Sequence, residues 1–166
     1  MILPVVELPD PHLKQASHAV SPNDPGLQKL IDQMLATMMH HPRCVGLAAP
    51  QVGKNVRIIV IDAGRVDKPG SRHGRLALLN PQITREERSR LLREGCLSIP
   101  DYTGNVLRYD AVEVRALNRD GREVRYKAHG FEAVVFQHEV DHLDGKLFLD
   151  RVGSLETDVF RRKSYG

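Results

Sequence analysis

His138-Glu139-Val140-Asp141-His142 is the segment around which the fold of this 166-residue chain has to be built. Residues four apart on an α-helix share a face, so the rings of His138 and His142 can bind one cation together. Glu139 then lies beside any water that the cation holds. The pattern indicates a metal-dependent hydrolase. A helix with two histidines and no metal is the alternative that this pattern alone leaves open.

Apolar residues lead directly into this motif. Phe131, Val134 and Val135 precede His138 at spacings that place them on the same helical face. Polar rings on such a face turn toward the interior, where they are costly without a partner. The helix is expected to end at Asp144-Gly145, because glycine adopts the left-handed cap conformation at little cost.

The length and charge of the chain limit its organisation and its partners. A chain of 166 residues predicts one domain, residues 1–166. The net charge of +3 is only mildly basic, and the final basic residues match no nucleic-acid-binding motif. We therefore expect no DNA partner.

Cysteine usage and the N-terminus bear on location. Met1-Ile2-Leu3-Pro4 does not show the basic segment and apolar core of a secretion signal, and no apolar run approaches the about 18 residues that cross a bilayer. We expect a cytoplasmic protein with no membrane association. In a reducing compartment Cys44 and Cys96 stay free, and a free cysteine can serve as a thiolate ligand.

The rest of the chain predicts a mixture of helices and strands. A helix with Asp24 as its cap and Pro25 in its first turn runs to about His40, with apolar residues at helical spacing. Residues 58–61 and 76–79 predict buried strands with a surface loop, residues 67–74, between them. Residues 112–116 and 124–128 alternate around a turn and predict a hairpin.

The C-terminal end predicts a last helix. Ser154 is a plausible N-cap, and the helix would run to about Lys163 with a basic last turn. Strands and hairpins between an N-terminal helix and a C-terminal helix indicate the α+β class.

A catalytic cation held by two histidines needs a third protein ligand. Glu156 follows His142 by only 14 residues, a short distance for two helices to fold back on each other. Cys96, within the segment 94–98, is the better candidate, because a thiolate binds zinc or ferrous iron strongly. A cysteine that stood alone would more simply be a small buried hydrophobe.

A third segment concentrates small residues around one amide. Residues 46–53 read Gly-Leu-Ala-Ala-Pro-Gln-Val-Gly, so Gln51 can approach a site closely and donate a hydrogen bond to a developing oxyanion. A tight structural turn is the alternative interpretation.

Together, residues 46–51, 94–98 and 137–142 closely resemble the three motifs of the peptide deformylase family, in order. The resemblance implies an enzyme that removes the formyl group from the first methionine of new proteins. It implies antiparallel β-sheets packed around the helix that carries the metal, with Cys96, His138 and His142 as ligands. One departure is Cys44, which stands where the family commonly has glycine.

The resemblance also implies roles at the site. Glu139 would take a proton from the attacking water, while the Gln51 amide and the backbone N–H of Leu97 would stabilise the oxyanion. Glu94 would pair with Arg108 to brace the cysteine segment. Substrate contacts are expected from the backbone of the first two motifs and from the walls of an apolar methionine pocket: Val45, Gly46, Gly95, Phe131 and Val134.

Cofactor and partner expectations follow from the same resemblance. The expected metal is Fe²⁺, with Zn²⁺, Ni²⁺ or Co²⁺ as substitutes, because this ligand set does not choose between zinc and iron by itself. The substrates would be N-formylmethionyl nascent peptides, which places the enzyme near the ribosome, and residues 161–163 are the segment expected to assist docking there. An HExxH metallo-endopeptidase is the alternative enzyme, and a module with a structural metal is the alternative outside catalysis.

Overall fold

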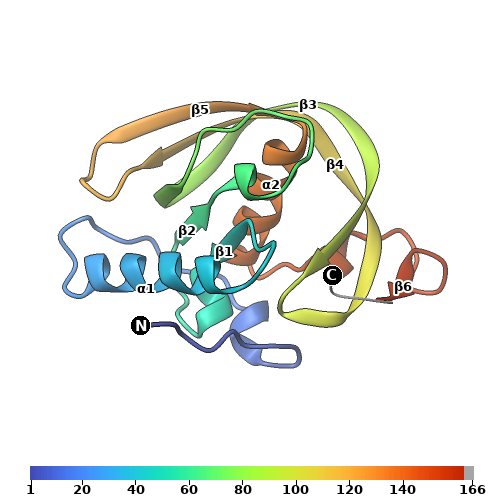
Figure 1. The fold of residues 1–166 in the computed structure, drawn as a ribbon, viewed down its shortest axis with the longest axis horizontal. Coiled ribbons are helices and arrows are strands. Elements are labelled where there is room, and N and C mark those ends of the chain that lie inside the picture. The colour runs from blue at the N-terminus through green and yellow to red at the C-terminus, as the bar shows by residue number, and fades with distance from the viewer. Residues whose placement is uncertain (163–166) are drawn as a thin grey trace.

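A single antiparallel sheet bends around a central helix in the computed structural model, which describes residues 1–162 (Figure 1). The helices are α1 (Leu27–His40) and α2 (Phe131–Leu143). The strands are β1 (Gly46–Ala48), β2 (Ile58–Ile61), β3 (Leu76–Cys96), β4 (Ile99–Leu117), β5 (Glu123–His129) and β6 (Val159–Arg161). Short 3-10 helices cover Pro11–Lys14, Ala49–Val52, Ala63–Arg65 and Phe148–Arg151. The α+β class is confirmed.

The strands follow one another along the sheet in the order β1-β2-β3-β4-β5, and β6 pairs with β4. The register of β3 against β4 shifts between Leu79 and Gln82 and again between Ile83 and Arg85. Such bulges let a long strand bend. Figure 1 shows β3 and β4 arching over α2, and the far end of this hairpin carries Cys96.

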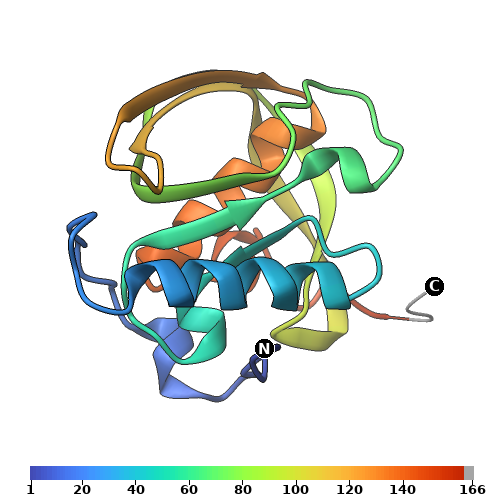
Figure 2. The ribbon, with the colours of Figure 1, turned by 60° about the vertical axis from the view of Figure 1, so that its left-hand side comes forward.

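The two faces of β2 belong to two cores, which explains why its residues form an unbroken apolar run. Ile58 and Val60 pack with α1, whereas Ile59 and Ile61 pack with α2. A strand covered on both faces needs apolar side chains on both. Figure 2 shows β1 and β2 between the two helices. The predicted strand at residues 58–61 is confirmed.

Helix α2 is buried on most of its sides. Ala133, Phe136 and Leu143 are fully buried, and Phe136 packs in a cluster with residues of β2, β4 and β5. The single apolar face predicted from the spacing was therefore too narrow, because the curved sheet surrounds the helix. The predicted helix end is confirmed: Asp144 is the C-cap, and Gly145 has φ of 74°.

The predicted start of the N-terminal helix needs correction. Helix α1 begins at Leu27 after Gly26, whose φ is 78°, so Asp24 is not its cap. The Asp24 carboxylate instead accepts the backbone N–H of Ser21 at 2.8 Å. The hairpin predicted at 112–116 and 124–128 is confirmed by the pairing of β4 with β5, and residues 67–74 form a loop as predicted.

The predicted C-terminal helix is wrong for the residues that the structure describes. The Ser154 hydroxyl does accept the N–H groups of Glu156 and Thr157, at 3.2 and 3.3 Å, but only one turn forms. Strand β6 follows and pairs with Tyr102–Gly104 of β4. The Arg93 guanidinium lies over the Phe160 ring, with its Cζ 3.6 Å from the ring centroid. Pairing with β4 outweighs the helical preference predicted for residues 154–163. Lys163, the predicted helix end, lies outside the described residues.

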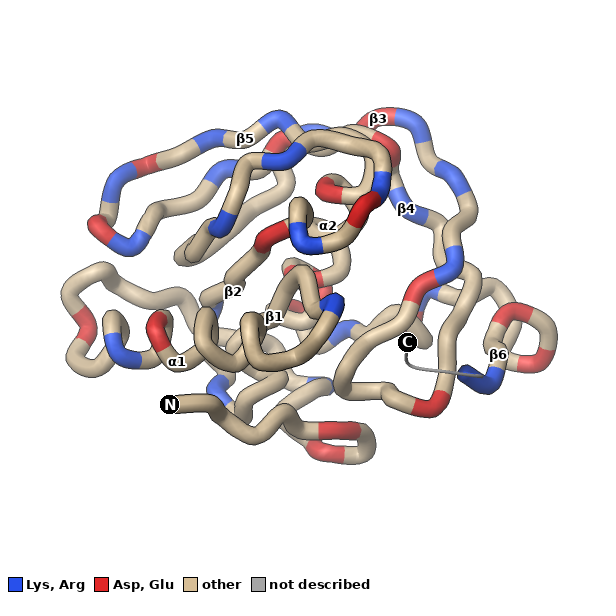
Figure 3. The backbone as a smooth tube through the Cα atoms, viewed as in Figure 1, with Lys and Arg blue, Asp and Glu red and all other residues tan. Residues whose placement is uncertain are grey.

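Charged side chains are spread over the outer strands. Figure 3 shows Lys and Arg spaced along β3, β4 and β5, with Asp and Glu between them. Several form ion pairs, among them Arg85 with Glu87 at 3.0 Å and Arg90 with Asp110 at 3.2 Å. Within residues 1–162, no helix is both long and apolar enough to span a membrane.

Substitution of Phe136 by Ala should destabilise the fold strongly. The ring is fully buried, so its removal leaves a cavity between α2 and the sheet and should lower the free energy of unfolding by about 3–5 kcal/mol. Urea unfolding measures this. Leu155→Ala is the control, because that side chain is 70% exposed and should change stability by less than about 0.5 kcal/mol. Equal effects of the two substitutions would contradict this packing.

Candidate metal centre and active site

Three side chains that are remote in sequence meet at one point. The ligand atoms of Cys96, His138 and His142 all lie within 4.8 Å of one another. The Cys96 Sγ is 3.4 Å from His142 Nε2, which is 3.2 Å from His138 Nε2. One turn of α2 supplies both histidines, and the end of β3 supplies the cysteine. One thiolate and two imidazoles form a donor set that suits zinc or iron, so these residues fit a catalytic metal.

The orientation of the His138 ring is set by Glu94. His138 Nδ1 hydrogen-bonds the Glu94 carboxylate, which directs Nε2 toward the other two ligands. Arg108 donates from Nε and Nη2 to the same carboxylate at 2.9 and 2.7 Å, so the expected Glu94–Arg108 pair is confirmed. Burial alone would raise the pKa of Glu94. The hydrogen bonds from Arg108 and His138 outweigh it and hold this pKa at about 2.

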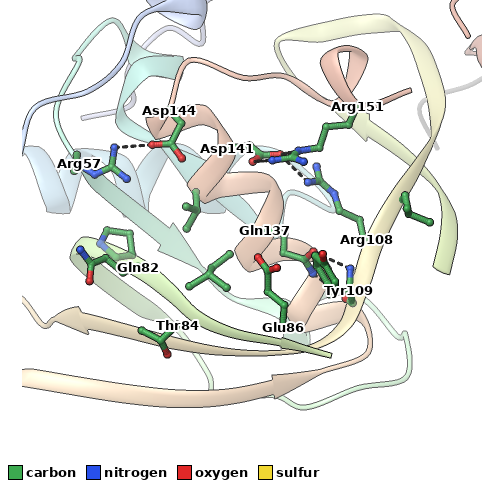
Figure 4. Close-up of a pocket in the computed structure, with 14 residues that line it drawn as sticks. Arg57, Gln82, Thr84, Glu86, Arg108, Tyr109, Gln137, Asp141, Asp144 and Arg151 are labelled. Carbon is green, nitrogen blue, oxygen red and sulfur yellow. Dashed lines mark hydrogen bonds and ion pairs between the residues drawn. The ribbon is translucent and has the colours of Figure 1, made fainter. Parts of the chain in front are cut away.

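Asp141 and Arg151 extend this arrangement, and the sequence analysis assigned neither a role. Arg108 Nη1 donates to Asp141 at 2.7 Å, and Arg151 donates to both oxygens of Asp141, at 2.5 and 2.7 Å. Asp141 is an acid on a helix whose apolar spacing predicted burial, and a buried acid requires a cation nearby, so this was the signal available in the sequence. These residues line a cavity of about 410 Å³ on another face of α2, shown in Figure 4.

Gln51 lies beside the candidate metal ligands. It lies in the short helix Ala49–Val52 and is 2% exposed. Its Oε1 accepts the backbone N–H of Ala48 at 3.0 Å, which orients the amide. The Nε2 is therefore directed at Cys96 Sγ and at Ser98 Oγ, 3.5 and 3.2 Å away. A donor group thus sits beside the three ligands.

Glu139 is a buried carboxylate with one oxygen free to accept a hydrogen bond. It is 4% exposed, and its Oε1 has no hydrogen-bond partner among the described residues. Burial raises the pKa of Glu139 to about 7, against the lowering effect of the neighbouring His138 charge. A carboxylate in this state can accept and return a proton near neutral pH.

Gly46 lies directly against this carboxylate. A Cβ atom built on Gly46 would be 2.6 Å from Glu139 Oε2, closer than real Cβ atoms approach. Glycine is thus required here by the packing of Glu139, in addition to any contact with substrate. The sequence analysis missed this contact, because the two residues are 93 positions apart.

Cys44 and Val45, which precede Gly46, form hydrogen bonds within the protein. The Cys44 thiol donates to the Gly46 carbonyl at 3.3 Å, and burial raises its pKa to about 11. Cys44 is therefore a protonated, packed side chain at neutral pH, with little of the thiolate that oxidation requires. The Val45 carbonyl accepts the backbone N–H of Asp62 at 2.8 Å.

The remaining predicted residues lie on α2 or next to Cys96 in the chain. Gly95 lies beside Arg162, whose Nη2 would be 2.2 Å from a Cβ at that position. Val134 is buried on α2, and the half-buried Phe131 ring is covered by Lys68, whose Nζ is 4.7 Å from its centroid. Leu97 is half-buried. Substrate contacts from these residues stay predictions.

The candidate third ligand Glu156 is not in the cluster. Among the described residues, the group that could hold the ion contains Cys96 and the two histidines, whereas Glu156 is exposed in the turn before β6. The choice of Cys96 over Glu156 agrees with this geometry.

Comparison with known proteins gives a consistent result. The sequence model of a family described as polypeptide deformylase matches residues 2–158. A peptide deformylase of Syntrophobacter fumaroxidans is 44% identical over 162 residues, which cover 98% of this chain and 93% of that protein. The crystal structure of a peptide deformylase from Legionella pneumophila superposes with a TM-score of 0.85 at 36% identity, covering 94% of this chain and 89% of that one.

A second structure carries a bound peptide. It is described as a class I type b peptide deformylase from Acinetobacter baumannii bound to Met-Ala-Ser, with a TM-score of 0.81 and 35% identity, covering 92% of this chain and 99% of that one. The family match and the similarity extend over nearly the whole chain. The chain therefore belongs to the polypeptide deformylase family, the metal-dependent hydrolases that remove the formyl group from the N-terminal methionine of newly made proteins.

Proposed function

We propose that Cys96, His138 and His142 hold the catalytic metal and that Glu139, Gln51 and Leu97 carry out the deformylation around it. The observation that carries this proposal is the convergence of the three ligands beside a buried carboxylate with an unpartnered oxygen. A purely structural site would gain nothing from such a carboxylate.

The protein's own groups account for the proton transfers and the charge. A bound divalent cation would lower the pKa of a coordinated water. Glu139 receives the proton of the attacking water and returns it to the departing amine. As negative charge grows on the formyl oxygen, Gln51 Nε2 and the Leu97 backbone N–H donate hydrogen bonds to it. The products are formate and a peptide with a free amino terminus.

The peptide is proposed to lie between the first two motifs, along Val45, Gly46 and Gly95, with its methionine side chain between Phe131 and Val134. Support comes from the Acinetobacter relative, which binds Met-Ala-Ser. The apolar character of Phe131 and Val134 suits a thioether side chain. The relatives compared above are all named deformylases, and none of these findings supports an endopeptidase.

We propose Fe²⁺ as the working metal, with Zn²⁺, Ni²⁺ or Co²⁺ able to replace it. One thiolate and two imidazoles accept all four ions, so the ligand set supports each of them. A cytoplasmic location is part of the proposal, because a thiolate ligand needs reducing surroundings. Ribosome docking through the basic C-terminal end stays a prediction. Of its residues, Arg162 packs on Gly95 and Arg161 is exposed.

The reaction is tested by comparing formyl-Met, acetyl-Met and uncapped Met peptides with ferrous protein prepared without oxygen. Formate should be released from the formyl peptide, and the acetyl peptide should react far more slowly, since its methyl group has to enter a site crowded by Gln51 and Glu139. Cleavage of internal amide bonds in the uncapped peptide would instead support the endopeptidase.

Glu139→Gln should abolish turnover while the metal is retained. The amide keeps the shape of the side chain but cannot accept the proton, so formate release should fall by at least about 100-fold. Metal content, measured by elemental analysis, should equal that of the parent protein. Glu156→Gln, at an exposed glutamate, is the control. Normal turnover by Glu139→Gln would refute the assigned role.

Gly46→Ala should reduce kcat with little change in metal content. The added methyl group has to displace the Glu139 carboxylate, and a displacement of about 1 Å at a reacting group can cost about 100-fold in rate. Gly64→Ala is the matched control, because a Cβ there meets its nearest neighbours at 3.7 Å. If both variants kept the parental kcat, Gly46 would have no part in placing Glu139.

A further inference from the structure

Three charged side chains form a buried group behind the metal ligands. Glu94, Asp141 and Arg108 are 8%, 6% and 2% exposed, and their formal charges sum to −1. Two carboxylates therefore compete for one guanidinium in surroundings of low dielectric. This shortage of positive charge matters to the site, because Glu94 hydrogen-bonds His138 Nδ1 and Arg108 hydrogen-bonds Glu94.

Arg151 supplies the missing positive charge. Its Nε and Nη2 bind both oxygens of Asp141, a two-pronged geometry that a lysine does not reproduce. Its side chain is 40% exposed and stands at the wall of the cavity behind α2 (Figure 4). The short helix Phe148–Arg151 that presents it is held by Asp150, which accepts the Leu147 N–H at 2.8 Å and pairs with Lys14 at 2.5 Å.

We infer that Arg151 is a positioning residue that controls how firmly His138 holds the metal, through Asp141, Arg108 and Glu94. When Arg151 satisfies Asp141, Arg108 keeps two of its donors on Glu94. Without Arg151, Asp141 draws Arg108 toward itself, and the carboxylate that orients His138 is less firmly held. This inference rests on the metal centre proposed above, since it concerns how firmly His138 binds the metal.

Arg57, the residue before β2, offers a matched comparison through its ion pair with the C-cap of α2. It lines the same cavity and pairs with Asp144, one turn after Asp141, at 3.0 Å. It also donates to the Leu143 carbonyl at 3.1 Å. Among residues 1–162, no hydrogen bond or ion pair joins Arg57 to Arg108 or Glu94. Loss of Arg57 removes an ion pair from the end of α2 without disturbing the charges behind His138.

The test measures metal release from Co²⁺-loaded protein, using excess chelator and the visible absorption of the cobalt–thiolate centre. Arg151→Gln should release Co²⁺ about 10-fold faster than the parent protein, the lower end of the effect of removing a group bonded directly to a ligand, because Arg151 acts through Asp141, Arg108 and Glu94. Arg151→Lys should be about threefold faster, because the charge remains but only one oxygen is bound at a time. Arg57→Gln should stay within about twofold of the parent rate, since it lies outside the chain of contacts.

The outcomes separate this inference from the proposed metal centre. His138→Ala should lose the cobalt–thiolate absorption, and equal binding by this variant would overturn the centre itself. If the centre holds, release from Arg151→Gln at the parent rate overturns the role of Arg151, and so does equally fast release from Arg57→Gln. Should Arg151→Gln fail to fold, Arg151→Lys decides: release at the parent rate overturns the inference.

Discussion

The hydrogen bond between Glu94 and His138 Nδ1 is the interaction on which the site depends. It joins the β3–β4 hairpin to α2 and leaves Nε2 of His138 directed at the other ligands. A buried carboxylate is costly by itself, and Arg108 compensates it with two hydrogen bonds. The position of the Cys96 segment and the orientation of one histidine are therefore determined by the same ion pair.

Close packing around α2 supports the chemistry as much as the ligands do. The curved sheet buries the helix on most sides, and the burial of Glu139 raises its pKa to about 7. Gly46 leaves the space that this carboxylate occupies. Gln51 is oriented by the backbone of its own turn before any substrate arrives. Preorganised groups of this kind do not have to be reordered during the reaction.

Where sequence patterns failed, a distant partner outweighed a local preference. Ser154 starts a turn as a helix cap would, but the strand that follows pairs with β4. Asp24 binds Ser21 in the preceding turn and does not cap α1. The apolar stripe of α2 was correct for the direction of the histidines but incomplete, because the spacing shows one face and cannot show that the sheet wraps around the others.

The local patterns by themselves determined the HExxH helix and its end, the buried strand at 58–61, the β4–β5 hairpin and, through three motifs, the family and the candidate ligands. These features depend on periodicity and on residue chemistry within short segments. Only the tertiary structure decided that Gly46 makes room for Glu139, that Arg151 completes the charges behind His138, and that Arg162 packs on Gly95. Such contacts join residues that are far apart in the chain, and they arise from the way the sheet closes around α2.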